Sequence, residues 1–497
     1  MPSSGLMPIF TSTRNRCPPP ELSVSPEAPI KSNHSNHPTD IITHMIVLFP
    51  YLKHRYYRHF RSQTRVLPSR LLAVGFLGLL VSCGGKSENS DSAAPNPEVV
   101  TAEAASRIDS LLRNMVVTGN VAGISALVWE KGQEAYFGAY GYSDREDSIP
   151  MDRNTIVQIY SMTKPITGTA LMTLYEDGAF ELDDPLTQYA PEFADMQVYT
   201  GVDENGEMLL EPVHRPISIR DITRHTAGFP NRPNIPGLSE ALAAADPLNR
   251  ENTLQQLGAK FGSLPLWFQP GSQWEYGPSV DVQAFLVERI SGQPYGAYVR
   301  EHVLDPLGME ETRYFVPESD RDRFSAMYRR EDDSTLTQLP DSTAKIEYLQ
   351  RWPLTRGGWG LTSTLDDYMR FARMLLNKGV LEGRAVLEPE TVELMATNHL
   401  PDSVEERSWL PGKGNVGFGI DFAVRVAPPA SPEENNGVVG EFFWDGAAST
   451  LFWVDPKNDL AAVLFVQLFP YDPIKLHKKF RDAVYGPYQP RSGTETE

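Results

Sequence analysis

Two widely separated stretches of this chain have the pattern of a β-hairpin, and they constrain the fold more than any other feature. Residues 123–144 form two apolar runs around Lys131–Gly132, and residues 447–469 form two runs around a turn at 455–459. Residues 96–119 and 472–486 have apolar positions at helical spacing. The order predicts an α/β fold: one antiparallel sheet of N- and C-terminal strands flanked by helices, plus a mostly helical lobe from the middle.

The first 83 residues have a different composition from the rest. Residues 1–45 are rich in Pro, Ser, Asn and His, and residues 53–65 are basic. Arg70 then precedes an apolar run at 71–82, which is too short to span a bilayer and is typical of a signal peptide. A buried helix or strand is the alternative. The ending "LVSC" resembles a bacterial lipobox, which implies cleavage before Cys83 and lipid attachment to its thiol.

These boundaries give a domain plan. We expect residues 1–65 to be a non-native or disordered extension, with translation starting near residues 66–67, because signal peptides have about 15–30 residues. Residues 66–83 would be the lipoprotein signal peptide, 84–98 a flexible polar tether, and 99–490 the folded domain. The protein would then be exported and lipid-anchored in the bacterial cell envelope (periplasm or outer membrane), with that anchor as its one membrane contact.

Cysteine usage and charge exclude several classes of function. The chain has two cysteines, Cys17 and Cys83, so the body offers no disulfide framework, no cysteine metal ligand and no cysteine nucleophile. The first 83 residues hold nine Lys/Arg and three Asp/Glu; the remainder holds 36 and 61, a net charge of −25. An acidic surface repels phosphate backbones, so we expect no nucleic-acid partner.

The segment "SMTK" at 161–164 opens a helical pattern that ends at Asp177–Gly178. Ser161 and Lys164 are spaced i, i+3 and would share one face of that helix. A neutral lysine can take the proton of an attacking serine, and burial and nearby positive charge favour the neutral form. The N-terminus of the helix also offers a dipole and a backbone N–H to a developing oxyanion.

A second pair with the same spacing, Ser342–Lys345, shows how weak the spacing is alone. Ser161 follows the apolar approach "TIVQIY", whereas Ser342 lies in a polar stretch and is predicted to be a surface loop or a helix cap. The chain has no Gly-x-Ser-x-Gly elbow, no His-Glu-x-x-His and no P-loop. A Ser–His–Asp triad stays open, because no motif points to one or excludes one.

Four long stretches resemble one known family in the order in which that family has them. They are "SMTK" (161–164), "ISIRDITRHTAGFP" (217–230), the segment 268–309 containing "WEYGPS", and "GGWGLTSTLDDYMRFARMLLNKG" (357–379). The resemblance covers about residues 105–485 and is to serine β-lactamases of class C type, penicillin-binding DD-peptidases and, most closely, family VIII carboxylesterases. It implies a β-lactamase/transpeptidase-like fold for the serine hydrolase domain at 99–490.

The resemblance assigns roles residue by residue. Ser161 would be the acylated nucleophile, Lys164 would activate it, and Tyr276 would be the second base. The backbone N–H groups of Ser161 and Ala447 would form the oxyanion hole. Many relatives carry Asn two positions after the tyrosine; here Pro278 stands there, so that polar contact is missing. No metal site and no metal or organic cofactor are implied.

The third motif of this family, which falls at residues 444–446, differs most from the family pattern. Relatives that handle β-lactams usually have Lys-Thr-Gly there, whereas this chain has Trp444-Asp445-Gly446. Trp444 cannot pair with a carboxylate, Asp445 would repel one if it faces the site, and Gly446 would let the backbone approach the substrate. We place these three residues and Trp359 in the substrate site. The alternative is that Trp444 is packing and Asp445 points away.

These observations predict a serine hydrolase that cleaves small-molecule carboxylic esters, of short to medium acyl chain, through an acyl-Ser161 intermediate. A β-lactamase or a D-amino-acid peptidase (DD-peptidase) is the enzymatic alternative, and an inactive binding or sensor protein the other one. His225 is expected to be a structural, hydrogen-bonded residue. Two or three of six tryptophans could wall an acyl pocket, namely Trp267, Trp274, Trp352, Trp359, Trp409 and Trp444.

Overall fold

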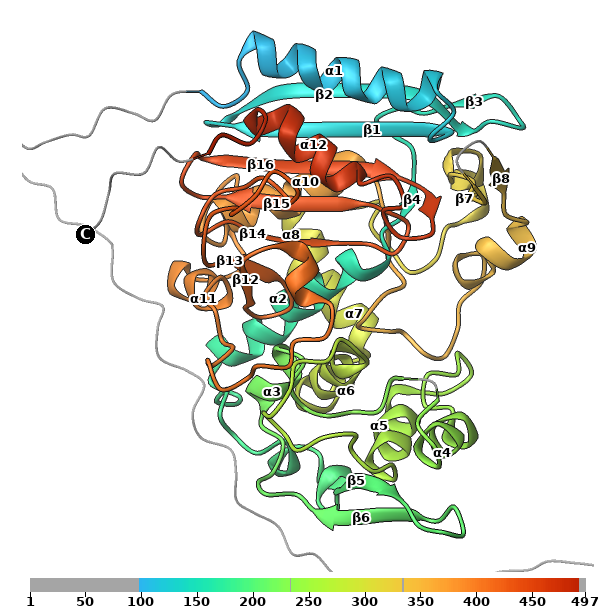
Figure 1. Ribbon diagram of the computed structural model, residues 1–497, viewed down its shortest axis with the longest axis vertical. Helices are drawn as coiled ribbons and strands as arrows, with labels where there is room; N and C mark the ends of the chain where they lie inside the picture. Colours follow the sequence, from blue (N-terminus) through green and yellow to red (C-terminus); the bar gives the residue numbers. More distant parts are fainter. Residues whose placement is uncertain (1–97, 233, 333–334, 491–497) are drawn as a thin grey trace, which may run out of the picture. The chain divides into compact units, whose positions relative to one another are not determined.

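The computed structural model describes residues 98–490 except 233 and 333–334 (Figure 1). The predicted extension at 1–65, the signal peptide at 66–83 with its lipid-bearing Cys83, and the tether at 84–98 apart from Glu98 lie outside the described residues. Within the described part, no helix has the length and apolar character needed to cross a bilayer.

The largest element of the described chain is an eight-stranded sheet in the order β12-β13-β14-β15-β16-β1-β2-β3, and all its neighbouring strands are antiparallel. Its strands are β1 Gly123–Glu130, β2 Gln133–Asp144, β3 Ile149–Pro150, β12 Val416–Phe418, β13 Ala423–Arg425, β14 Phe442–Asp445, β15 Leu451–Asp455 and β16 Leu460–Val466. In the middle of the sheet β1 pairs with β16, so that Ile124 lies opposite Val466. The predicted sheet of N- and C-terminal strands is therefore confirmed.

Both predicted hairpins are present. Lys131 and Gly132 link β1 to β2 with φ of 49° and 79°, the left-handed pair that a tight two-residue hairpin turn requires. The second hairpin is β15–β16, turning at residues 456–459. The prediction differs in one detail: residues 447–450 are not strand but form the turn that joins β14 to β15. Ala447 therefore lies just past the end of a strand, where its backbone N–H is not committed to the ladder of β14.

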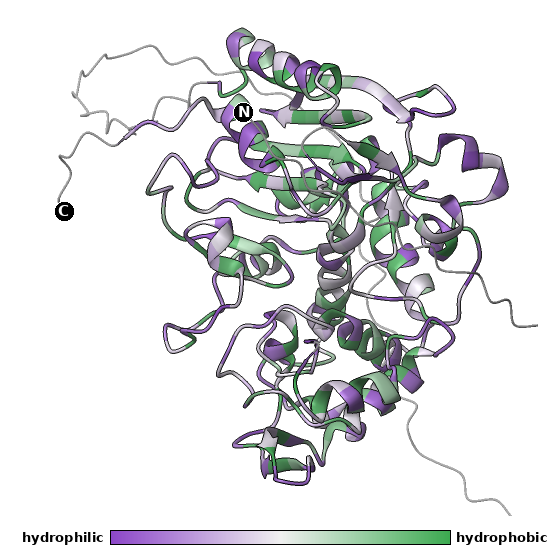
Figure 2. Ribbon diagram, turned by 45° about the vertical axis from the view of Figure 1, so that its right-hand side comes forward, coloured by the Kyte–Doolittle hydropathy of each residue, from purple (hydrophilic) through white to green (hydrophobic). Residues whose placement is uncertain are grey.

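Helices cover both faces of the sheet, which explains why its central strands are apolar throughout. All seven residues of β16 are buried, a pattern expected only for a strand covered on two sides. Helices α1 Ala102–Val117 and α12 Leu476–Tyr485 lie against each other, and α1 also contacts β1 and β2. Helix α10 Leu365–Leu376 contacts β1, β15 and β16. Figure 2 shows the resulting concentration of hydrophobic colour in the sheet.

The middle of the chain supplies the predicted helical lobe, drawn below the sheet in Figure 1. Its helices are α3 Ile219–Thr223, α4 Leu238–Ala245, α5 Leu254–Gly262, α6 Ser279–Ser291 and α7 Tyr295–Val299, with the hairpin β5 Gln197–Val202 and β6 Met208–Pro212, whereas α8 Asp305–Leu307 contacts α10 beside the sheet. Other short elements are α9 Asp341–Ala344, α11 Pro389–Met395, β4 Val157–Gln158, β7 Tyr328–Arg330, β8 Leu336–Gln338, β9 Thr362–Ser363, β10 Val380–Leu381, β11 Arg384–Ala385 and β17 Leu468–Phe469.

Helix α2 Thr163–Glu176 runs between the sheet and the lobe, and its start carries the predicted nucleophile. The predicted helix is present, and every residue from Thr163 to Met172 is buried, so α2 is a core helix over this range. It packs against α6, and the turn that precedes it contacts β14. This contact brings the first turn of α2 to the end of the β14 strand.

Candidate active site

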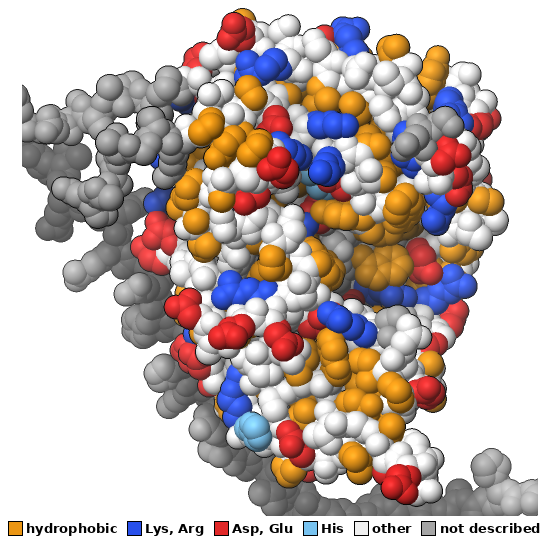
Figure 3. Space-filling view, in the orientation of Figure 1, with side chains coloured by type: hydrophobic (Ala, Val, Ile, Leu, Met, Phe, Trp, Pro, Cys, Tyr) orange, Lys and Arg blue, Asp and Glu red, His pale blue; other side chains and the backbone are white. Residues whose placement is uncertain are grey.

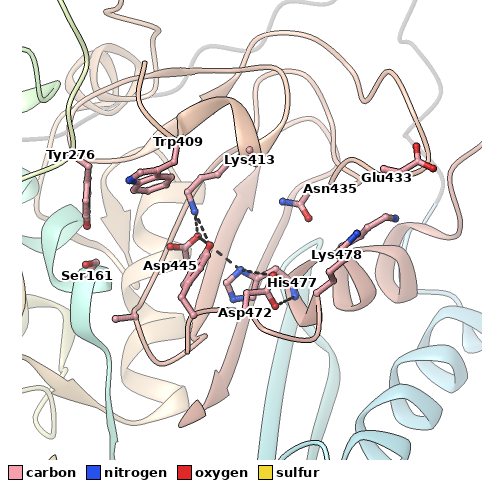
Figure 4. A pocket seen from close by; sticks show the side chains of 14 residues that line it. Ser161, Tyr276, Trp409, Lys413, Glu433, Asn435, Asp445, Asp472, His477 and Lys478 are labelled. Carbon is pink, nitrogen blue, oxygen red and sulfur yellow. Dashed lines mark hydrogen bonds and ion pairs between the residues drawn. The ribbon is translucent and has the colours of Figure 1, made fainter. Parts of the chain in front are cut away.

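A cavity of about 690 Å³ opens where the start of α2 meets the end of β14 (Figure 4). The residues of this cavity come from α2's N-terminal turn, the α6 approach, the 409–413 loop, β14 and the region around α12. They are Ser161, Tyr276, Trp409, Gly412, Lys413, Glu433, Asn435, Asp445, Ala447, Tyr471, Asp472, Lys475, His477 and Lys478. Four of them, Ser161, Tyr276, Asp445 and Ala447, are sequence-predicted site residues.

Ser161 lies in a 3₁₀ turn, Tyr160–Met162, immediately before α2. Tyr160 has a φ of 45°, an uncommon left-handed conformation for a residue with a side chain, and it turns the chain sharply into Ser161. Two rings hold Tyr160 in place: Trp359 stacks on it with centroids 6.3 Å apart, and Phe469 meets it edge-on at 5.7 Å. The nucleophile therefore sits on a packed turn and not on a free loop.

Lys164 reaches back from the first turn of α2 to the serine. Its Nζ donates to Ser161 Oγ at 3.2 Å and to the carbonyl oxygen of Gly358 at 2.6 Å. The same Nζ lies 4.5 Å from the centroid of the Tyr276 ring, and the residue is 4% exposed. The structure thus places the three predicted catalytic residues together, with the lysine between the serine and the face of the tyrosine.

Gly358, whose carbonyl accepts from Lys164, is itself bonded through its N–H to a buried acid that the sequence did not single out. Gly358 N–H donates to Asp281 Oδ1 at 3.0 Å, and Thr167 of α2 donates to the carbonyl of Gly357 at 2.7 Å. Burial raises the pKa of Asp281, while the bond from Gly358 and the charge of Lys164 oppose that rise. Residues 357–358 therefore form a bracket between α6 and the start of α2.

Tyr276 is fixed by its neighbours on the lobe side of the cavity. Its backbone carbonyl accepts from Asn231 Nδ2 at 2.8 Å, and its hydroxyl accepts from the indole Nε1–H of Trp444 at 3.3 Å. Pro278, which stands where relatives have Asn, caps the start of α6. The contact that this Asn would have offered is missing, and the carbonyl of Gly358 is instead the second partner of Lys164.

His225 is buried as expected but is not hydrogen-bonded. Neither ring nitrogen has a partner among the described residues, and the ring packs against Trp274, Tyr276 and Phe418 at 5.9, 4.8 and 5.3 Å. Burial, and next the charge of Lys164, hold the pKa of His225 well below its usual value, so it is neutral. It acts as an aromatic packing residue behind the tyrosine.

Of the third motif, Trp444 lies outside the cavity and Asp445 lines it. Trp444 is 1% exposed and is not among the residues of the cavity; it lies behind Tyr276, with ring centroids 5.4 Å apart. Asp445 does face the cavity, but its carboxylate is paired with Lys413 and accepts from the Tyr471 hydroxyl at 2.8 Å. The premise that Asp445 presents an uncompensated negative charge to substrate is therefore wrong.

Gly446 is needed for protein packing and not for room beside a substrate. A Cβ at this position would lie 2.3 Å from Thr450 Oγ1 and 2.6 Å from the carbonyl oxygen of Ile159. The strand end therefore approaches the backbone just before Tyr160–Met162 as closely as only glycine allows. This approach brings Ala447 into the cavity with Ser161, as the predicted oxyanion hole requires.

Lys413 and the residues around it are the part of the cavity that sequence reasoning missed. His477 Nε2–H donates to the Ser449 carbonyl oxygen, 2.9 Å away, and its Nδ1 lies 3.9 Å from a carboxylate oxygen of Asp445 and from one of Asp472. Although acidic and histidine side chains meet here, no group of three or more potential metal ligands is found among the described residues. The sequence did not indicate Lys413, in "LPGKGN", as a site residue, because no motif links it to residue 445.

The tryptophans are spread over several locations. Trp409 lines the Ser161 cavity, and Trp274 packs behind Tyr276 with centroids 6.2 Å apart. Trp352 and Trp359 line a separate cavity of about 190 Å³ with Arg356, so the structure does not bring Trp359 into the Ser161 cavity. Its stacking on Tyr160 instead supports the nucleophile's turn from behind.

In the second Ser-x-x-Lys stretch, Ser342 is at the surface as predicted, whereas Lys345 is buried. Ser342 is exposed on the short helix α9, where it is the second residue and not the cap. Lys345 forms an ion pair with Asp341 at 3.0 Å. The lysine is therefore committed to a carboxylate, whereas Lys164 is bonded to the serine and to a neutral carbonyl.

Comparison with known proteins agrees with this geometry. The protein-family model described as Beta-lactamase matches residues 108–485. An uncharacterized protein of Mycobacterium tuberculosis is 33% identical over 370 residues, covering 72% of this chain and 89% of that protein. Esterase EstB of Burkholderia gladioli is 28% identical over 416 residues, covering 79% of this chain and 99% of EstB.

Among solved structures, the fold is shared with "EstCE1, a hydrolase with promiscuous acyltransferase activity". The TM-score is 0.62 at 23% sequence identity, and the match covers 77% of this chain and 99% of EstCE1. At that identity the likeness concerns the fold, namely an antiparallel sheet covered by helices, with a helical lobe.

Proposed function

This chain belongs to the β-lactamase family of serine enzymes, and we propose that it hydrolyses carboxylic esters through an acyl intermediate on Ser161. The observation that carries the proposal is the 3.2 Å contact between Lys164 Nζ and Ser161 Oγ inside a cavity that also contains Tyr276 and Ala447. Similarity to EstB and to the fold of EstCE1 supports an ester as the substrate.

In the acylation step Ser161 Oγ attacks the ester carbonyl. When the Lys164 amine is neutral, the serine hydroxyl donates its proton across the 3.2 Å contact, so the lysine acts as the base. The negative charge that develops on the carbonyl oxygen is stabilised by the N–H groups of Ser161 and Ala447. As the ester C–O bond breaks, the proton passes through Tyr276 to the leaving alkoxide, which departs as the alcohol.

Deacylation repeats the same steps with water in place of serine. Tyr276 and Lys164 take a proton from a water that attacks the acyl carbon, and Ser161 recovers its proton as the acid leaves. The bond from Trp444 Nε1–H to the Tyr276 hydroxyl, 3.3 Å long, fixes the position of that oxygen. Trp444 thus supports the second base from behind.

The direct test uses residues 96–497 and two chromogenic substrates, p-nitrophenyl butyrate and nitrocefin, assayed with the wild type and Ser161→Ala. We expect the ester to be hydrolysed faster than nitrocefin, and we expect the Ser161→Ala variant to lose at least about 10³-fold in kcat for the ester. Ester hydrolysis that survived Ser161→Ala would refute the nucleophile assignment. A nitrocefin rate equal to the ester rate would instead favour β-lactam hydrolysis.

We also propose that the enzyme is exported and held at the cell envelope by a lipid on Cys83. The support is the sequence around residues 70–83: a basic residue, an apolar run and a lipobox-like ending. Mass spectrometry of the mature N-terminus tests it. A mature protein that begins at Cys83 with a lipid adduct is the expected result, and mature peptides from upstream of Cys83 would contradict it.

A further inference from the structure

The cavity wall that adjoins the nucleophile carries a second lysine in an aromatic setting. Lys413 Nζ lies 4.9 Å from the ring centroids of both Trp409 and Trp444 and 5.2 Å from that of Tyr471. Its side chain is 5% exposed, and it lines the same cavity as Ser161. Figure 4 shows its ammonium pointing down to Asp445 between Trp409 and His477. This position makes it a cation of low solvation beside the reacting centre.

The hydrogen bonds of Lys413 leave part of its donor capacity unused. The ammonium donates to the Asp445 carboxylate and to the Tyr471 hydroxyl at 2.9 Å, and that hydroxyl donates to Asp445 at 2.8 Å. An ammonium has three N–H donors, and these bonds use two of them. No acceptor for the third is found among the described residues. A buried donor without a partner is costly, which favours a ligand oxygen as that partner.

Two further lysines line the cavity besides Lys413. Lys475 and Lys478 line the cavity beyond Lys413, and Asp472 is engaged by the backbone N–H groups of Leu476 (2.5 Å) and His477 (3.3 Å) at the start of α12. On the face that Figure 3 shows, basic and acidic side chains alternate without a large patch of one sign. The cavity likewise holds three carboxylates beside its three lysines, and Lys478 is paired with Asp482 at 2.6 Å, so Lys413 does not act through a general positive charge of the wall.

We propose that the ester substrate carries a carboxylate, which binds to the free N–H of Lys413. This inference rests on the proposed esterase function and names the substrate class of that same cavity. The sequence argued against an anionic substrate because residue 444 is not lysine and Asp445 is acidic. The structure removes both reasons, since Asp445 is already paired and a lysine reaches the cavity from a different segment, the loop at 410–413.

Asp445 has a definite part in this arrangement. By pairing with Lys413 it fixes the ammonium in direction, but it also cancels most of the positive charge that a substrate carboxylate would meet. Removing the charge of Asp445 should therefore strengthen selection for an anionic ester, and removing the charge of Lys413 should weaken it. A purely structural ion pair would impair both kinds of substrate alike.

The test compares esters that are matched in length and differ in charge. In the acyl arm, p-nitrophenyl hemisuccinate is compared with p-nitrophenyl butyrate, and in the alcohol arm, 4-carboxyphenyl butyrate is compared with phenyl butyrate. The measured quantity is the ratio of kcat/KM for the anionic ester to that for the neutral ester. The arm with the higher ratio tells whether the carboxylate belongs to the acyl or the alcohol part.

We expect Lys413→Met to lower this ratio at least 10-fold and Asp445→Asn to raise it about 3- to 10-fold in the same arm. Because Lys413→Met leaves a buried carboxylate unpaired and could prevent folding, the double variant Lys413→Met/Asp445→Asn removes both charges and should show the low ratio too. Lys479→Met, the same substitution at an exposed lysine of α12 that does not line the cavity, is the matched control with an unchanged ratio.

The outcomes separate this inference from the function on which it rests. If the wild type hydrolyses none of the four esters, the esterase proposal fails. If it hydrolyses neutral esters in a Ser161-dependent way, while Asp445→Asn and the double variant leave the ratio within 2-fold of wild type in both arms, the carboxylate proposal alone is overturned.

Discussion

The two Ser-x-x-Lys stretches of this protein have the same spacing and different partners. Ser161 and Lys164 lie at the start of a helix that is buried from Thr163 to Met172, and the lysine is bonded to the serine and to the carbonyl of Gly358. Ser342 is exposed on a helix of four residues, and Lys345, the buried residue at the end of that helix, is paired with Asp341.

The difference teaches that the partners of the lysine matter more than the motif. A carboxylate partner supplies a charge that compensates the ammonium, whereas a carbonyl and a serine hydroxyl supply none. Both lysines are buried, so burial does not distinguish the two stretches and the partner of the lysine does. The following predictions test this contrast, beginning with the largest effect.

Replacing each lysine by methionine should separate the two stretches most strongly. Lys164→Met removes the base and should lower kcat/KM for p-nitrophenyl butyrate by about 10³-fold, within the usual range for a general base. Lys345→Met, which has the same spacing to its serine, should stay within 2-fold of wild type. Equal losses in the two variants would mean that the contrast drawn here is wrong.

Asp281 tests whether the bracket at 357–358 positions Lys164. Asp281→Ala leaves the buried Gly358 N–H without an acceptor and should lower kcat about 10-fold with little change in KM. Asp281→Asn keeps an acceptor oxygen and should restore most of that loss. A merely structural residue would change the melting temperature in both variants without this rescue of kcat.

The same residue gives a prediction for pH. Because burial raises the pKa of Asp281 in the folded protein, its contribution to stability is complete below about pH 3.9 and is lost as the pH rises through the raised pKa. Asparagine does not titrate. The melting temperature of Asp281→Asn relative to wild type should therefore increase from pH 4 to pH 7; a constant difference would show that Asp281 has an ordinary pKa.

Trp444→Phe removes the donor to the Tyr276 hydroxyl and keeps a ring in place. The expected loss is about 3- to 10-fold in kcat/KM, the amount that one neutral hydrogen bond contributes. A kcat/KM within 2-fold of wild type would leave Trp444 as packing alone.

Ser342→Ala should have the smallest effect. The hydroxyl is exposed, and we expect activity and melting temperature to remain within error of wild type. A clear loss of ester hydrolysis in this variant would give the second stretch a role that its surroundings do not indicate.

Much of the fold could be predicted from the sequence because its signals are local. The hairpin at 123–144, the helix ended by Asp177–Gly178 and the β15–β16 hairpin each carry their periodicity and turn residues within a short window. The burial of α2 from Thr163 to Met172 could not be predicted in this way, because it depends on the sheet and the lobe packing against opposite sides of one helix.

The candidate site shows the same division. Ser161, Lys164, Tyr276 and Ala447 could be placed by family resemblance. Lys413 could not, because its meeting with Asp445 depends on how a Gly-rich loop crosses the end of β14. The role of Asp281 could not be predicted either, because its partner is the backbone N–H of Gly358 and a sequence motif does not show a bond to the backbone.

The pairing of β1 with β16 has a consequence for when this enzyme becomes active. β1 cannot pair with β16 until residues 460–466 have been synthesised, which is long after β1 and the helical lobe have left the ribosome. Contacts so distant in sequence form late in folding, because a long loop must close before they stabilise anything. Ala447 and Lys413 join Ser161 only at that point, so a growing chain carries its nucleophile for most of synthesis without the means to use it.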